Sequence, residues 1–270
     1  MYKIINKKKL VATAVADGIG HLLFGAYRLF RKNGKVRTDE IKNILIIRTA
    51  YIGDVVMTLP VLKPLKELYP GAKISFLTAA GAVEVLKNNP FVDEVIAYDP
   101  FWFYPSSMWA YGKFIRQMRT RAFDLVIEAR ADIRDILLLA WPLKARYRLS
   151  YDVGGGGYLL SHVVPYPGLR HKVEYHLDLV RYLGYRGNGL EWGVYLSDAE
   201  QQRVSAIIAE QGIGPSFIAV HPGSRLLLKR WPVQRYGALC DGLMEKYGMP
   251  VVVFGAGSEK DLGAGVRMQF

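Results

Sequence analysis

The chain has 270 residues, of which 51% are hydrophobic and 22% charged, so it can bury a sizeable core and is not disordered throughout. Its single cysteine, Cys240, excludes an internal disulfide framework and a cysteine-rich metal site. The formal net charge of +12 favours anionic partners, such as nucleic acid, a phosphate-bearing ligand or an acidic membrane surface.

The positive charge is concentrated at the N-terminus. Residues 1–37 contain nine lysines and arginines and one acid, Asp17, and so carry +8 of the total of +12. The rest of the chain has a nearly ordinary charge balance. Because nucleic-acid-binding domains usually carry their basic residues across a whole face, we expect no nucleic-acid partner.

Within this basic segment, residues 10–30 repeat apolar side chains at helical spacing over about 30 Å if helical. Asp17, His21 and Arg28 interrupt the stretch and would be costly to bury in a bilayer. We expect an amphipathic helix on the anionic surface of the inner membrane, held through residues 1–37. The alternatives are a helix packed on the domain and a true membrane span or signal anchor.

From residue 41 onward, strand and helix patterns alternate, which is typical of an α/β fold with a parallel sheet. Four glycines at 154–157 predict a flexible loop near a ligand or hinge. The expected strands are 44–48, 73–78, 94–98, 124–128 and 147–150, and the expected helices are 55–69, 82–88, 108–119, 133–141 and 172–183.

The alternation restarts after residue 191. We expect a helix at 198–211 with Ser197 as its N-cap, a strand at 217–221, a helix at 231–247 and a strand at 250–254. The sequence thus predicts an N-terminal extension (1–40), a first α/β domain (41–190) and a second (191–270). A doubly wound domain normally has more than two strands, so we expect the second to be incomplete and the chain truncated at its C-terminus.

One candidate site follows the first strand, where Gly53 and Asp54 lie at the start of the next helix. Ligands of open α/β sheets bind just beyond the carboxyl ends of strands, which favours a functional carboxylate. The alternatives are that Asp54 is an N-cap and that Gly53 supplies backbone freedom to the turn.

A second candidate site lies in the last third of the chain. Ser224, Lys229 and Arg230 stand between a strand and a helix N-terminus, where backbone N–H groups and lysine or arginine charges attract a diphosphate. Glu259 follows the next strand and is placed to accept hydrogen bonds from ribose hydroxyls. A solvated basic loop and a surface glutamate are the respective alternatives.

Other chemistries lack their motifs. The first strand is not followed by G-x-G-x-x-G, and no phosphate-binding P-loop or G-x-S-x-G is present. His171 and His176 are five residues apart, which is wrong for two metal ligands on one helical face, so we expect no metal site. The aromatic residues at 101–104 form either an acceptor groove or a packed loop.

Three motifs in this order resemble glycosyltransferase family 9, the lipopolysaccharide heptosyltransferases. They are R-x-x-x-x-G-D-x-x-x-T-x-P at residues 48–60, H-P-G-S with K-R-W-P at 221–232, and V-V-V-F-G-A-G-S-E at 251–259. The resemblance implies the GT-B fold, with two Rossmann-like domains, the second incomplete here. The family's usual D-x-G-x-x-H segment does not occur before Phe270.

The resemblance also implies a reaction: metal-independent, inverting transfer of a heptose from a nucleotide sugar such as ADP-heptose to a lipid-linked saccharide of the lipopolysaccharide inner core, at the cytoplasmic face of the inner membrane. The nucleotide sugar is a substrate, and no cofactor is implied. Asp54 resembles the catalytic base, with Gly53 admitting the acceptor. Lys229, Arg230 and Ser224 resemble phosphate-binding residues, and Glu259 the ribose-binding acid. The alternative is a degenerate, non-catalytic membrane-associated fragment that binds nucleotide sugars.

Overall fold

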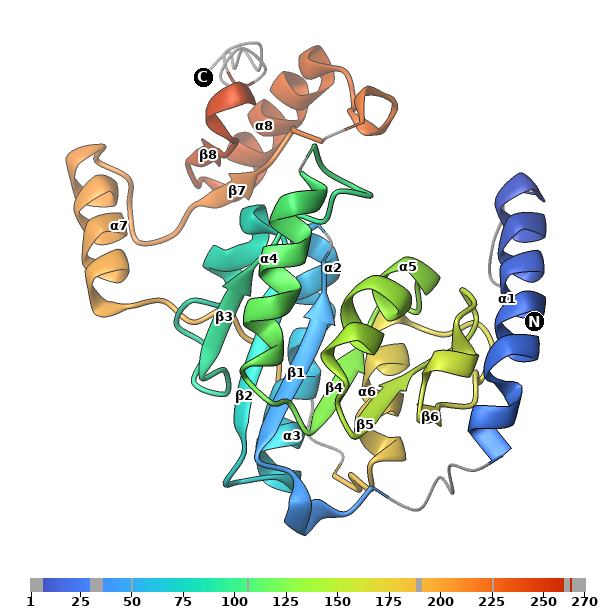
Figure 1. Cartoon of the computed structure of the whole chain (residues 1–270). Helices are drawn as coiled ribbons and strands as arrows, with labels where there is room; N and C mark the ends of the chain where they lie inside the picture. The colour runs from blue at the N-terminus through green and yellow to red at the C-terminus, as the bar shows by residue number, and fades with distance from the viewer. Residues whose placement is uncertain are drawn as a thin grey trace. The chain divides into compact units, whose positions relative to one another are not determined.

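The computed structural model describes residues 7–29, 36–49, 51–105, 107–187, 191–224, 226–259 and 263. The chain forms two compact units, Met1–Tyr195 and Leu196–Phe270 (Figure 1). Among the described helices, none combines the length and apolarity that crossing a membrane would require.

The first unit is built on a six-stranded parallel sheet with the strand order β3-β2-β1-β4-β5-β6 (Figure 1). The order reverses direction between β1 and β4, as in the doubly wound Rossmann arrangement. The strands are β1 (Asn43–Arg48), β2 (Lys73–Thr78), β3 (Glu94–Ala97), β4 (Leu125–Glu128), β5 (Tyr147–Ser150) and β6 (His162–Val163). The five expected strands are confirmed, while the two-residue β6 was not anticipated.

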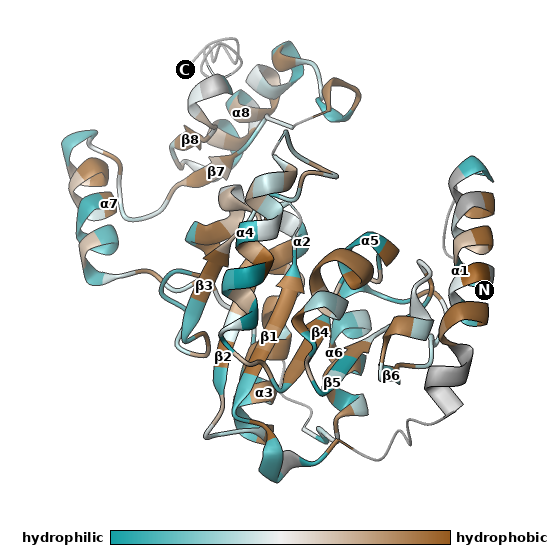
Figure 2. Cartoon of the chain, viewed as in Figure 1, coloured by the Kyte–Doolittle hydropathy of each residue, from teal (hydrophilic) through white to brown (hydrophobic). Residues whose placement is uncertain are grey.

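The sheet is buried on both faces, which explains the unbroken apolar run in β1. Ile44 and Ile46 belong to one core cluster, and Leu45 and Ile47 belong to another on the opposite face. Residues of α3 (Leu62–Leu68) and α6 (Lys172–Tyr182) share the first cluster, and residues of α4 (Met108–Arg119) share the second. Figure 2 shows the apolar strands lying between helices of mixed polarity.

Several expected helices are shorter or tighter than the sequence pattern suggested. The helix expected at 55–69 is divided into α2 (Ile52–Val56), a 3-10 turn at Leu59–Val61 and α3, because Pro60 cannot donate a backbone hydrogen bond. The segment expected at 82–88 is a 3-10 helix at Ala80–Val85. The helix expected at 133–141 comprises α5 (Ile133–Asp135), a π-helical turn at Ile136–Ala140 and the 3-10 turn Trp141–Leu143.

The N-terminal helix α1 (Lys7–Leu29) packs on the first unit through one face. Asp17 accepts a 2.7 Å hydrogen bond from the backbone N–H of Gly156. Gly20 lies directly against the ring of Tyr158, and Phe24 stacks on the same ring with 5.7 Å between centroids. Of the alternatives for this segment, packing on the domain is therefore confirmed.

The four-glycine loop, expected near a ligand or hinge, forms part of the surface that receives α1. Gly155 and Gly156 have φ of 87° and 82°, a region that favours glycine. A Cβ on Gly155 would lie 2.6 Å from the side chain of Thr13 on α1. The glycines thus permit close approach of the helix.

The opposite face of α1 is apolar and exposed. Val11, Val15, Ile19 and Leu22 follow one another at helical spacing, and each side chain is more than half exposed. A helix docked on a globular unit ordinarily buries its apolar face and exposes its polar one. Here the exposed face is a contiguous apolar strip, visible as brown bands on α1 in Figure 2, while the docked face contains Asp17 and Gly20.

The second unit contains α7 (Asp198–Glu210), β7 (Ile218–Val220), α8 (Val233–Tyr247) and β8 (Val251–Val253). The two strands are parallel, and Cys240 of α8 packs with Val220 at the centre of a small core. Ser197 caps α7 as expected. Its hydroxyl accepts a hydrogen bond from the Glu200 backbone N–H, and its own backbone N–H donates to the Glu200 carboxylate, which completes a capping box.

Candidate active site

The carboxyl ends of β1 and β4 lie next to each other where the strand order reverses, the position at which open α/β sheets bind ligands. Arg48 is the last residue of β1, and its guanidinium is buried. It donates a 2.6 Å hydrogen bond from Nη2 to Oδ1 of Asp54 on α2. The Asp54 side chain is 39% exposed, so a buried cation holds a carboxylate that solvent or a substrate can reach.

Asp54 is the third residue of α2, and the N-cap is Tyr51, whose side chain makes no capping hydrogen bond. The N-cap alternative for Asp54 is therefore wrong. The turn alternative for Gly53 is also wrong, because Gly53 is helical and does not have a positive φ. A Cβ at Gly53 would meet no other atom within 4 Å, so the side-chain direction there is open space.

Two buried acids lie beside this ion pair: Glu128, the last residue of β4, and Asp135, the last residue of α5. Glu128 accepts backbone hydrogen bonds from Arg130 and Ala131 at 2.8 and 2.7 Å. Burial, reinforced by the nearby Asp135 carboxylate, raises the pKa of Glu128 to about 8. Asp135 accepts hydrogen bonds from Thr49 and Trp102, and burial raises its pKa to about 6. Burial lowers the pKa of Arg48, an effect opposed by Asp54 and Glu128.

The aromatic loop at 101–104 is packed against this cluster. Trp102 donates from Nε1 to Asp135, and the guanidinium carbons of Arg130 and Arg134 lie 3.9 and 4.3 Å from the centroid of the Phe103 ring. Arg130 also donates to the backbone carbonyl of Thr49 at 3.3 Å. Arg130 is thus fixed beside Thr49, which directly follows β1.

Sequence reasoning singled out Asp54 but assigned no role to Arg48, Glu128 or Arg130. A usable signal was present, since Glu128 ends an expected strand and Arg130 lies just beyond it. Carboxyl ends of neighbouring parallel strands meet at one edge, but which strands are neighbours is decided by the sheet order.

The histidines are ordinary, as expected: His176 is buried, its pKa is lowered to about 3 by burial, and its Nδ1 lies 2.8 Å from the Met57 carbonyl.

In the second unit, a cavity of about 180 Å³ lies at the carboxyl ends of β7 and β8. Its lining includes Gly223, Phe254, Gly255 and Glu259. One Glu259 oxygen accepts a 3.0 Å hydrogen bond from the backbone N–H of Ala256, which fixes the carboxylate at the cavity. This position differs from the freely solvated surface glutamate that was the alternative.

The structure brings three of the expected residues of the second unit together. Arg230 donates from Nε to the Ser224 carbonyl at 2.7 Å, and its Nη2 lies 3.8 Å from Glu259. A Cβ on Gly223 would overlap the Glu259 carboxylate, so only glycine allows this approach. Lys229 ends the 3-10 turn Leu227–Lys229 with an exposed side chain, and among the described residues no acid pairs with its ammonium group.

Asp54 and Gly53 belong to the first unit, and Ser224, Lys229, Arg230 and Glu259 to the second. Within the described part of the chain, no group of three or more His, Cys, Asp and Glu side chains is arranged to hold a metal ion.

The first unit is a doubly wound parallel sheet with a carboxylate at its switch point, and the second is a smaller parallel α/β unit with a basic loop after its first strand. The sequence model of glycosyltransferase family 9 (heptosyltransferase) matches residues 111–266, more than half of the chain. The chain belongs to this family.

Two curated relatives are lipopolysaccharide heptosyltransferases. Lipopolysaccharide heptosyltransferase 3 of Escherichia coli is 26% identical over 215 residues, which cover 77% of this chain and 62% of the relative. Lipopolysaccharide heptosyltransferase 1 of Pseudomonas aeruginosa is 21% identical, covering 81% and 62%. The chain thus spans a little under two thirds of the length of these relatives.

Solved structures of the family share the fold. The glycosyl transferase family 9 structure from Veillonella parvula has a TM-score of 0.74 at 20% identity, covering 88% of this chain and 69% of that one. The structure of Escherichia coli heptosyltransferase WaaC with ADP has a TM-score of 0.62 at 20% identity, covering 84% and 72%. These likenesses confirm the expected GT-B-like α/β class.

Proposed function

We propose that the protein transfers a heptose from a nucleotide sugar, ADP-heptose or a close relative, to a saccharide of the lipopolysaccharide inner core. Family membership and the heptosyltransferase relatives support this reaction. The observation that carries it to particular residues is the ion pair between buried Arg48 and accessible Asp54 at the switch point of the first sheet.

Asp54 serves as the general base. Its carboxylate accepts the proton of the acceptor hydroxyl while the hydroxyl oxygen attacks the anomeric carbon of the donor sugar. The bond from the anomeric carbon to the diphosphate oxygen breaks, and the nucleoside diphosphate leaves with the bonding electron pair. Attack opposite the leaving group inverts the anomeric centre. Arg48 holds Oδ1 of Asp54, and among the described residues none donates a hydrogen bond to Oδ2.

The second unit binds the donor. Lys229 and Arg230 stabilise the negative charge that develops on the departing diphosphate, and no metal ion is needed for this role. The Ser224 segment contacts phosphate. Glu259, fixed at its cavity by the Ala256 N–H, accepts hydrogen bonds from the ribose hydroxyls. Open space above Gly53 leaves room for the acceptor.

The test pairs turnover with donor binding. Asp54→Asn should lower turnover of ADP-heptose at least 100-fold, because general-base catalysis contributes roughly that much, while calorimetry finds donor affinity unchanged. Asp99→Asn, at another strand end of the same sheet, is the control. Lys229→Ala should weaken donor binding about tenfold, and Lys246→Ala on α8 should not. Full turnover by Asp54→Asn would refute the assignment, and donor binding without turnover in the unaltered chain would favour the non-catalytic alternative.

The inverting and metal-independent character is tested separately. Proton NMR of the product should show inverted anomeric configuration, and turnover should persist in excess EDTA. Retention of configuration, or loss of turnover that added Mg²⁺ restores, would contradict this part of the proposal.

We also propose that α1 places the enzyme at the cytoplasmic face of the inner membrane. The exposed apolar strip Val11, Val15, Ile19 and Leu22, within the basic segment 1–37, supports contact with anionic lipid. Val15→Ser with Leu22→Ser should reduce binding to phosphatidylglycerol vesicles at least tenfold without loosening the docked face. Val204→Ser, an exposed apolar residue of α7, is the control, and equal vesicle binding by both variants would refute the proposal.

A further inference from the structure

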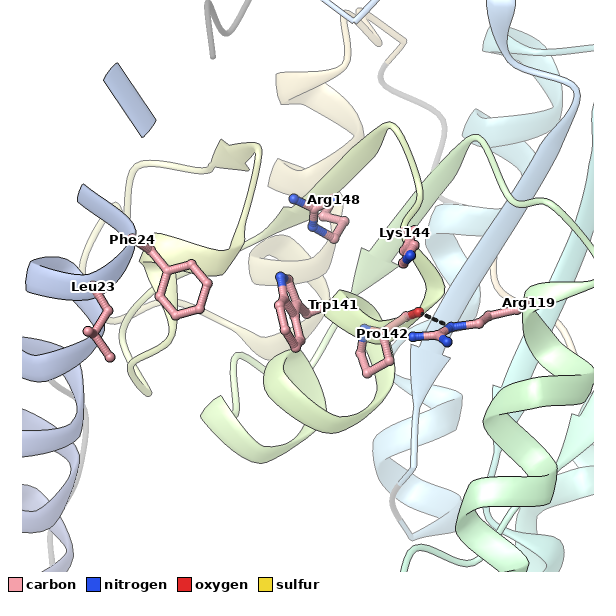
Figure 3. Close-up of a pocket in the computed structure, with 7 residues that line it drawn as sticks. All are labelled: Leu23, Phe24, Arg119, Trp141, Pro142, Lys144 and Arg148. Atoms are coloured by element: carbon pink, nitrogen blue, oxygen red, sulfur yellow. Dashed lines mark hydrogen bonds between the residues drawn. The ribbon is translucent and has the colours of Figure 1, made fainter. Parts of the chain in front are cut away.

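The first unit contains a cavity of about 560 Å³ where α1 meets the segment after the π-helical turn (Figure 3). Its residues come from α1, the end of α4, the segment leading into β5 and β5 itself, and none of them belongs to the ion pair or the buried acids at the carboxyl ends of β1 and β4. Its lining residues are Leu23, Phe24, Arg119, Trp141, Pro142, Lys144 and Arg148.

Three of the seven lining residues are cations, and none is an acid. Arg119 donates from Nε to the Pro142 carbonyl at 2.6 Å, and Arg148 donates to the carbonyls of Leu159 and Ala145 at 2.8 and 2.6 Å. Backbone carbonyls therefore orient both guanidinium groups. Among the described residues, no carboxylate forms an ion pair with Arg119 or Lys144. The cavity is electrostatically suited to an anion.

The other wall is apolar and continues to the surface. Phe24 meets Trp141 edge to face with 5.9 Å between ring centroids, as Figure 3 shows from the side. Leu23 is 69% exposed and Trp141 is 40% exposed, so the wall opens outward rather than closing over the cavity. Leu23 also borders the exposed apolar strip of α1. A compact hydrophilic anion would leave this apolar wall in water.

We propose that this cavity binds one anionic phospholipid. Its phosphate lies between Arg119, Lys144 and Arg148, and the start of an acyl chain lies along Leu23, Phe24 and Trp141. The site would convert general adhesion of α1 into a fixed attachment to a single lipid. The inference rests on the membrane contact proposed above and not on the transfer reaction.

The test uses a water-soluble lipid, so that it does not depend on vesicle association. Dihexanoyl phosphatidylglycerol, below its micellar concentration, is titrated into the full chain by calorimetry. Arg119→Gln with Lys144→Gln should weaken binding at least tenfold. The matched control is Arg116→Gln with Lys87→Gln, which removes the same charge from exposed positions outside the cavity, one of them on the same helix. Thermal unfolding verifies that all variants are folded.

The position of the lipid's acyl chain is tested by tryptophan fluorescence. Phosphatidylglycerol with brominated acyl chains should quench tryptophan emission in the unaltered protein, and Trp141→Phe should abolish most of this quenching. Val15→Ser with Leu22→Ser should retain binding of the soluble lipid while losing vesicle binding, so the cavity and the helix surface can fail independently.

Three results would overturn the proposal. The first is equal binding by the cavity and control variants. The second is equal affinity for sn-glycerol 3-phosphate, which has the phosphate without the chains and would make the site a phosphate site. The third is equal affinity for dihexanoyl phosphatidylcholine, which would remove the requirement for net negative charge.

Discussion

Replacing Gly20 by alanine tests how α1 is held on the first unit. A Cβ at this position would lie 2.5 Å from Cε2 of Tyr158 and closer still to two other ring atoms. Ordinary carbon–carbon contact is about 3.5–4.0 Å, so the ring or the helix must move by about 1 Å or more. The Tyr158 ring is stacked on Phe24 and meets His21 at its edge, which restricts its retreat.

The loss of docking stability in Gly20→Ala is isolated by comparison with a matched variant. Overpacking of this kind costs about 1–3 kcal/mol. Alanine is also a better helix former than glycine by up to about 1 kcal/mol, which would mask part of the loss. Gly18 lies two residues away on the same helix, and a Cβ there meets nothing within 4 Å. Gly18→Ala receives the same helical gain, so the difference between the two variants isolates the clash.

Native-state hydrogen exchange of the α1 amides measures this difference. Most helical stability in proteins comes from packing on the rest of the fold, so the amides of α1 exchange once the helix leaves the unit. We expect Gly20→Ala to exchange about 5- to 150-fold faster than Gly18→Ala, which corresponds to 1–3 kcal/mol at about 1.4 kcal/mol per tenfold change. Amides of β1 should be equally protected in both variants. Equal exchange of α1 in the two variants would refute the close contact between Gly20 and Tyr158.

Two further predictions concern the buried acid and the second unit. Since folding raises the pKa of Glu128 to about 8, the folded state favours the protonated acid, and stability from this group is lost as pH rises through that value. Urea unfolding should show about 1 kcal/mol less stability at pH 8.5 than at pH 7, a range in which His176 is neutral in the folded state and mostly neutral in the unfolded state, and Glu128→Gln should remove this difference. Ser197→Ala should lose the capping box of α7 and cost about 1 kcal/mol of helix stability, measured by exchange of its first-turn amides, whereas Ser205→Ala should leave them unchanged.

Elements with a strong local signal were predictable from the sequence. The apolar run at 44–48 is typical of a strand buried on both faces, and it forms β1. Ser197 was identified as an N-cap because its hydrogen bonds involve residues three positions away. The Gly53–Asp54 pair was placed at a strand end for the same local reason.

Other features depend on residues distant in the chain, and only the tertiary structure decided them. Arg48 became the partner of Asp54 because β1 leads directly into α2, but the buried acids joined them only because β4 is the neighbour of β1 in the sheet. Which face of α1 docks on the rest of the unit was decided by the contacts of Asp17 and Gly20 with the glycine loop and Tyr158. These contacts join residues more than 130 positions apart. Periodicity determines that a helix has an apolar face, whereas shape and hydrogen bonding with the rest of the fold determine which face is buried.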